Sequence, residues 1–163
     1  MKLARCVPVL LASVVLVSCM SSEQRAIETY FTEAQNVAER LVEAASEFST
    51  LMNAQSNPLQ WSAEDTAKLD TILETFEGLK DEAEDMSVPE ALEDIHPLLV
   101  ESLGDMTAAV EIIVNIAHDP TTASMEKAQD MTANAENAEK LAGEYVQKLQ
   151  SRLEEKYPEL LQE

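Results

Sequence analysis

The stretch IETYFTEAQNVAERLVEAASEFSTLM, residues 27–52, decides the fold of this chain. Apolar side chains recur in it at alternating steps of four and three, which places them on one stripe of a long helix. That stripe comprises Ile27, Phe31, Ala34, Ala38, Leu41, Ala45, Phe48 and Met52. A second apolar row lies beside it and contains Tyr30, Val37, Ala44 and Leu51. Because this row widens the apolar surface, we expect more than one helix to pack against it.

The same spacing recurs in three later segments that are separated by short stretches rich in Asn, Pro and Ser. We expect helices over about 62–86, from Pro89 to about Ala117, and from 120 to 157. The chain has only 3 glycines and is rich in alanine, leucine and glutamate, which favours helix over sheet. Four helices joined by short loops predict an all-α, antiparallel up-down-up-down four-helix bundle over residues 23–157, with 158–163 as a C-terminal tail.

Polar residues and prolines mark where these helices start. Ser62, Ser87 and Asp119 each stand where an N-cap would satisfy the free amide groups of the second, third and fourth helix. Pro97 interrupts the third helix, so we expect a kink there or a short first turn followed by a fresh start. Trp61 lies beside the start of the second helix, where we expect it to pack against the end of the bundle.

A signal-peptide pattern precedes the helices. After a basic start, the apolar run 7–17 is well short of the roughly 20 residues that a membrane-spanning helix needs. Small Ser18 follows this run and comes directly before Cys19. We therefore expect residues 1–18 to be a signal peptide that is removed from the mature protein.

The sequence LVSC, which is Leu16, Val17, Ser18 and Cys19, resembles the lipobox of bacterial lipoproteins. The resemblance implies cleavage before Cys19, lipid on that cysteine, and a short tether over 19–22. It also implies a lipid-anchored protein on the extracytoplasmic face of the cell membrane or the outer membrane. The alternative is an ordinary secretory signal in which the cysteine happens to lie near the cleavage site.

A broader resemblance covers most of the chain. The order of lipobox, two helices, PEALEDIH (89–96) and an Asp-Pro pair before the last helix is similar to small helical lipoproteins of Gram-positive bacteria that are catalogued as domains of unknown function. That resemblance implies the fold and the location, and it brings no catalytic residues with it.

The charge of the chain limits its partners. There are 31 acidic and 11 basic residues. Removal of 1–18 takes away Lys2 and Arg5, which leaves 9 basic residues against 31 acidic ones, a formal charge of −22. So negative a surface is repelled by nucleic acid and by anionic lipid headgroups. The charge therefore excludes nucleic-acid binding. It either keeps the protein soluble or attracts cations or a basic partner surface.

Residues that could carry chemistry are few. A di-iron bundle needs two Glu-x-x-His units, and the chain offers one in Glu93 and His96, while His118 has Asn115 in the matching position. The Cys-x-x-Cys-His motif for covalent haem is absent from the sequence, as is a glycine-flanked nucleophilic serine. We therefore expect a non-enzymatic protein without metal or cofactor, in which His96 has a structural role beside Pro97.

Two hypotheses for function follow. The first is a membrane-anchored interaction module that contacts another envelope protein or a second copy of itself. It would carry a surface strip that is apolar beyond the needs of the core, for which the candidates are Tyr30, Val37 and Leu51.

The second hypothesis is a carrier that encloses a small ligand or a metal in the bundle. The small alanines of the fourth helix would leave a cavity opposite Phe31, Phe48 and Phe76.

Overall fold

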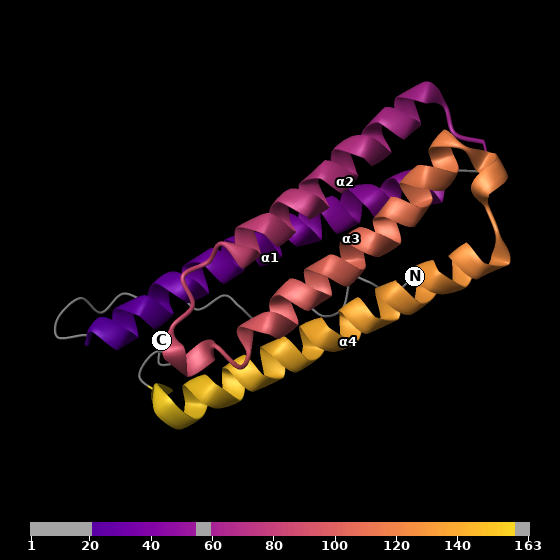
Figure 1. Cartoon of the computed structure of the whole chain (residues 1–163). Helices are drawn as coiled ribbons and strands as arrows, with labels where there is room; N and C mark the ends of the chain where they lie inside the picture. The colour runs from indigo at the N-terminus through magenta and orange to yellow at the C-terminus, as the bar shows by residue number, and fades with distance from the viewer. Residues whose placement is uncertain (1–20, 55–59, 159–163) are drawn as a thin grey trace.

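The computed structural model describes residues 21–54 and 60–158, and the regular structure within them is entirely helical (Figure 1). The four long helices are α1 (Ser22–Ala54), α2 (Ala63–Glu84), α3 (His96–His118) and α4 (Met125–Lys156). Two short 3-10 helices, η2 (Glu90–Leu92) and η3 (Pro120–Thr122), lie before α3 and before α4. The predicted all-α four-helix bundle is therefore confirmed, while the predicted signal peptide and Cys19 lie outside the described residues.

Successive helices run in opposite directions (Figure 1). The start of α1 and the end of α4 lie at one end of the bundle, on the left of Figure 1, together with η2. We call this the near end. The opposite end holds Trp61 and η3, and we call it the far end.

The core divides into two clusters along the bundle. The near-end cluster takes side chains from all four helices and from η2, among them Ile27, Tyr30, Leu79, Leu92, Leu103, Tyr145, Leu149 and Leu153. The far-end cluster takes its buried side chains from α1, α2 and α3, namely Ala44, Phe48, Leu51, Leu69, Ile72, Phe76, Val110, Val114 and Ala117. Within the described chain, α4 adds no buried side chain to this second cluster.

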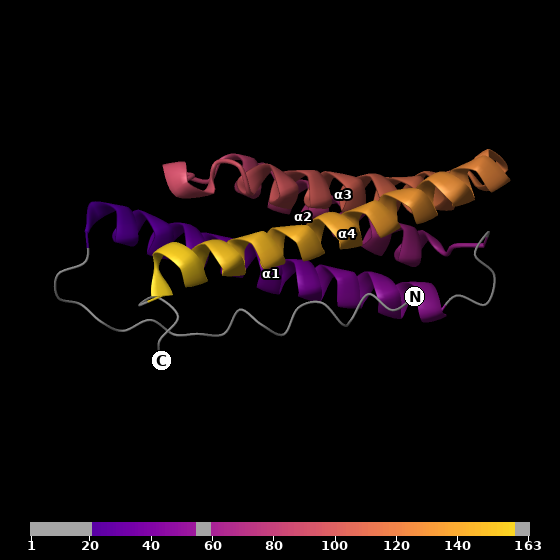
Figure 2. The ribbon, with the colours of Figure 1, turned by 90° about the horizontal axis from the view of Figure 1, so that it is seen from below.

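The course of α4 explains this division. Seen from below, α4 is inclined to α1, and its first turns lie beside α3 (Figure 2). The buried residues of α4 are Ala138, Tyr145, Leu149 and Leu153, all of which follow its first three turns. The Ser102 hydroxyl of α3 donates a hydrogen bond to the carbonyl oxygen of Ala138 in α4, with 2.9 Å between the two oxygens. This bond brings the two helices close.

The central row of α1 differs from the expected one. The buried residues are Ile27, Tyr30, Ala34, Val37, Ala44, Phe48 and Leu51. Phe31, Ala38, Ala45 and Met52, which were expected in the centre, are only partly buried and flank this row. Both rows are apolar and keep the heptad spacing, so which of them is central depends on where α2 and α3 lie around α1.

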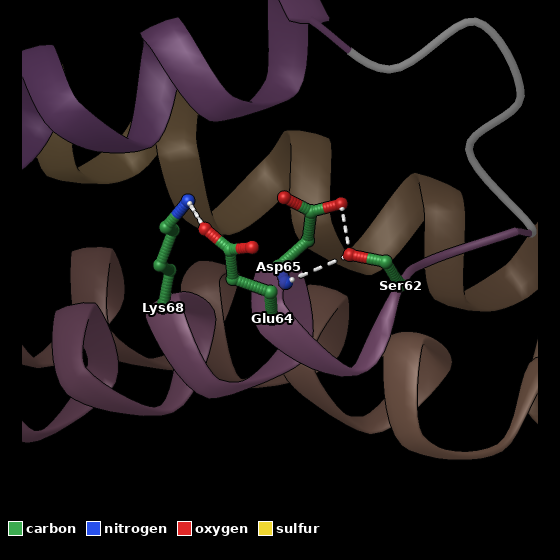
Figure 3. A network of polar contacts seen from close by, with 4 residues as sticks. All are labelled: Ser62, Glu64, Asp65 and Lys68. Atoms are coloured by element: carbon green, nitrogen blue, oxygen red, sulfur yellow. Dashed lines mark hydrogen bonds and ion pairs between the residues drawn. The ribbon is translucent and has the colours of Figure 1, made fainter.

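The start of α2 is as expected. The Ser62 hydroxyl accepts a hydrogen bond from the backbone N–H of Asp65 at 3.1 Å and donates one to the Asp65 carboxylate at 2.7 Å (Figure 3). Trp61 is partly buried and packs against the far-end cluster, which confirms the expected packing at the end of the bundle.

The starts of the last two helices confirm one expectation and correct two. The chain forms η2, turns, and starts α3 afresh at His96 with Pro97 in the first turn, as expected. The prediction that Ser87 caps this region is wrong: the N-cap of η2 is Pro89, no side-chain cap bond is present there, and Pro97 delays the long helix.

The predicted cap Asp119 holds η3 rather than α4. Its carboxylate accepts a hydrogen bond from the N–H of Thr121 at 3.0 Å. Ala123 is then extended, so the helix is interrupted and α4 starts again at Ser124, whose hydroxyl accepts from the N–H of Lys127 at 3.1 Å.

The two serines at 62 and 87 allow a direct test of these starts. We expect Ser62→Ala to lower the free energy of unfolding by about 1 kcal/mol, because it removes an N-cap. Ser87→Ala should change it by less than about 0.5 kcal/mol, since that serine caps nothing in the described structure. Urea denaturation of both variants measures the difference, and equal losses would contradict the assignment.

Candidate functional site

A chain of buried polar groups crosses the near end of the bundle. The hydroxyl oxygens of Tyr145 and Tyr30 lie 3.1 Å apart, and the Tyr30 hydroxyl lies 3.2 Å from Nδ1 of His96. His96 is also hydrogen-bonded to the backbone of Ala83. These contacts join α4, α1, α3 and α2 in that order. We call Tyr145, Tyr30 and His96 the Tyr–His chain.

Burial sets the protonation of these groups. Tyr30 is 0% exposed and Tyr145 is 4% exposed. Burial raises the pKa of both tyrosines, and burial also lowers the pKa of His96, against the opposing effect of its hydrogen bond to the Ala83 backbone. All three groups are therefore neutral near pH 7. A buried phenol held neutral makes a poor base or nucleophile, so the arrangement suits a structural link between helices.

Sequence reasoning placed His96 correctly at the start of a helix but did not predict its tyrosine partners. Tyr30 lies on the central apolar row of α1, and its ring also meets the His96 ring edge-on at 5.8 Å between centroids. The available signal was a tyrosine among core positions, because a buried phenol hydroxyl generally has a hydrogen-bond partner. The sequence did not show which residue that partner would be.

Two further contacts tie α4 to the near end. Arg152 pairs with Asp94 at 2.9 Å between Nη2 and Oδ2 and also donates a hydrogen bond to the carbonyl of Ala91. The hydrogen bond from Arg152 lowers the pKa of Asp94. The Tyr157 hydroxyl donates to Oε1 of Glu23 at 2.6 Å, which links the end of α4 to the start of α1.

The residues considered for metal binding do not come together. Glu93 is exposed, His96 belongs to the Tyr–His chain, and His118, at the other end of α3, lies 2.7 Å from Asp70. Over residues 21–54 and 60–158, no group of three or more His, Cys, Asp or Glu residues could hold a metal ion. Leu16, Val17 and Ser18, which were predicted to form a lipobox, and Cys19, which was predicted to carry lipid, lie outside the described residues.

A groove of about 780 Å³ lies between α1 and α2 in the half of the bundle toward the far end. Leu51 and Ile72, both almost fully buried, form its apolar floor. Its walls carry small side chains, namely Ser46, Thr50, Ala54, Ala67 and Thr71. We call this feature the α1–α2 groove.

The rim of the α1–α2 groove is acidic. Glu47, Glu64 and Asp65 contribute carboxylates, and Lys68 is the single basic residue among the lining residues. Lys68 is paired with Glu64 at 2.7 Å (Figure 3). An open groove with small walls, an apolar floor and an excess of acid suits the docking of a basic segment better than the enclosure of a small molecule.

The expected apolar surface strip is not found. Tyr30, Val37 and Leu51 are buried, with 0%, 3% and 9% of their surfaces exposed. They belong to the central buried row of α1, whereas the sequence pattern predicted that they lie beside the central stripe. The large hydrophobic side chains that are exposed in the described chain are Val42 and Met125.

The expected cavity is not formed by the residues proposed for it. Phe48 and Phe76 are buried in the far-end cluster, to which α4 contributes no buried residue of the described chain, and Phe31 packs against the near-end cluster. The three rings are therefore divided between two clusters and do not surround one space with α4.

Comparison of the sequence with models of protein families finds no match, and comparisons with curated proteins and with solved structures find none either. No helix among the described residues combines the length and the apolarity needed to cross a bilayer.

The central position of Tyr30 in the Tyr–His chain predicts unequal costs for removing the two tyrosine hydroxyls. Tyr30→Phe leaves the Tyr145 hydroxyl and Nδ1 of His96 without partners, so we expect a loss of about 2–3 kcal/mol in the free energy of unfolding. Tyr145→Phe removes an end of the chain and leaves Tyr30 bonded to His96, so its loss should be about 1 kcal/mol. Chemical denaturation at about pH 8 measures both losses, and a larger loss for Tyr145→Phe would contradict the central position of Tyr30.

Proposed function

We propose that this protein is a lipoprotein anchored on the extracytoplasmic face of the cell membrane or outer membrane, where it acts as a non-enzymatic helical interaction module. The observation that carries the proposal is the sequence LVSC, residues 16–19, at the end of the apolar run 7–17, which is too short to span a bilayer. Several acyl chains on Cys19, each buried methylene contributing roughly 0.8 kcal/mol, would hold the chain firmly on the membrane.

The position of the anchor gives the bundle an orientation. Helix α1 starts at Ser22, three residues after Cys19, so the near end would face the bilayer. Because α1 has 33 residues, it is about 50 Å long. The far end, with the α1–α2 groove in the adjacent half, would then point away from the membrane toward other envelope components.

The partner that suits this groove is a helical segment with basic residues beside an apolar strip. The small walls made by Thr50, Ala67 and Thr71 allow a helix to approach closely, and Leu51 and Ile72 give it an apolar floor. The acidic rim attracts basic side chains, while a formal charge of −22 on each mature chain opposes the approach of a second copy. A basic partner is therefore favoured over self-association.

Replacing the cysteine tests the anchor. In its own cells, the wild-type protein should appear in the membrane fraction with added acyl mass and without residues 1–18. Cys19→Ser should lack the acyl mass, because serine offers no thiol for the lipid. Mass spectrometry of membrane and soluble fractions measures this, and a wild-type protein cleaved elsewhere without acyl mass would contradict the proposal.

A photoreactive amino acid placed at Thr50, inside the α1–α2 groove, tests the docking surface. It should form a cross-link to a basic partner in intact cells, whereas the same amino acid at the exposed Thr132 of α4 should not. Ala67→Trp should reduce the Thr50 product at least tenfold, because the indole fills the groove. Equal products from both positions, or a product that joins two copies of this chain, would contradict the assigned surface.

A further inference from the structure

The Tyr–His chain has a direction that follows from the chemistry of its members. The His96 ring is hydrogen-bonded to the backbone of Ala83, and because this bond raises the pKa of His96 the ring N–H donates it to the Ala83 carbonyl. Nδ1 lies 3.2 Å from the Tyr30 hydroxyl, so we assign the ring proton to Nε2. Neutral Nδ1 then accepts from Tyr30, and the oxygen of Tyr30 accepts from Tyr145. Each donor in the chain has one acceptor.

We propose that His96 is an acid-sensitive latch, whose protonation reverses this chain of hydrogen bonds and loosens α4 from α1. The proton enters at Nδ1, which changes from acceptor to donor. The N–H at Nδ1 now points at the oxygen of Tyr30, so the Tyr30 hydroxyl turns to donate to Tyr145. The Tyr145 hydroxyl is left without an acceptor.

The burial of Tyr145 makes this reversal costly. Its side chain is 4% exposed, and Tyr30 is the hydrogen-bond partner that the structure gives it within the described residues. Water therefore cannot take the place of the lost acceptor, and a buried donor without a partner is strongly disfavoured. Protonation also places a positive charge on a partly buried ring.

Helix α4 is the element that the reversal loosens. Its links to α1 include the Tyr145–Tyr30 contact and the Tyr157–Glu23 hydrogen bond, beside the apolar contacts of the near-end cluster, while its first turns lie on α3 and bury no side chain in the described core. The links from α4 to the start of α3, through Arg152 and Asp94, do not involve α1.

The described contacts of His96 bring it close to groups of α1, α2 and α4. From α1 it faces Tyr30, and from α4, beyond Tyr30, it faces Tyr145. From α2 it faces the carbonyl of Ala83, whose neighbours Glu82 and Glu84 pair with Arg40 and Lys80. Glu33, one turn after Tyr30, has a buried carboxylate oxygen without a hydrogen-bond partner in the described chain and needs its own control.

The sign of the pH effect follows from the lowered pKa of His96. The unfolded chain takes up the proton at about pH 6.5, before the folded chain does. The contribution of neutral His96 to the stability of the folded chain is therefore complete above that pH. It is lost as the pH falls through the lower pKa of His96 in the folded state.

The test compares the pH dependence of unfolding in the full chain and in His96→Asn, which retains an acceptor near Nδ1 but cannot be protonated. As the pH falls from about 8 to about 5, the unfolding equilibrium constant of wild type should rise relative to that of His96→Asn. The rise should be about tenfold for each unit by which the folded pKa of His96 lies below 6.5. His118→Asn and Glu33→Gln should retain the wild-type dependence.

Two further readouts identify the latch itself. Nitrogen NMR of the His96 ring at about pH 8 should show the Nε2–H tautomer. Amide exchange, corrected for its intrinsic pH dependence, should show that residues 145–153 of α4 lose protection at low pH by a larger factor than residues 72–79 of α2. Parallel pH profiles for wild type and His96→Asn, the Nδ1–H tautomer, or equal loss of protection in both helices would overturn the proposal.

Discussion

A tyrosine hydroxyl in a core has to find a hydrogen-bond partner, and in this bundle that need falls on Tyr30, whose side chain is completely buried. Its oxygen meets Tyr145 on one side and His96 on the other, while His96 reaches the backbone of Ala83. Apolar contacts between helices allow them to slide, because burial has little directional preference. The hydrogen bonds of Tyr30 and His96 depend on distance and angle, so together they fix the relative positions of four helices at the near end.

The buried residues described in the far-end cluster are all apolar, so no buried chain of hydrogen bonds joins the helices in that cluster, and the bundle is uneven along its length. Three helices close the far-end cluster, and the described part of α4 lies against α3 there. Buried contacts and polar links are concentrated where α1 starts and α4 ends. For a chain tethered through Cys19, as we propose, the constrained half would lie against the membrane and the more open half would be available to partners.

Charge influences partner choice more than it influences the fold. The ion pairs of the described residues are largely exposed, such as Arg40 with Glu82, and such pairs contribute little to stability. The excess of acidic side chains would instead repel nucleic acid and other copies of this chain. At the α1–α2 groove the same excess lies beside an apolar floor, so attraction and burial would favour the same kind of basic helix.

The sequence by itself determined the number of helices, their approximate bounds, the fresh start at His96 and the cap at Ser62. These features depend on local chemistry, namely heptad spacing, the geometry of proline and the free amide groups of a first turn. The sequence also contains LVSC, whose resemblance to a lipobox is the basis of the proposed location. Only the tertiary structure decided which apolar row of α1 is central, that α4 leans onto α3, and that Tyr30, Tyr145 and His96 meet. These facts depend on how each helix is rotated and inclined against its neighbours, and two adjacent apolar rows of equal spacing are compatible with more than one rotation.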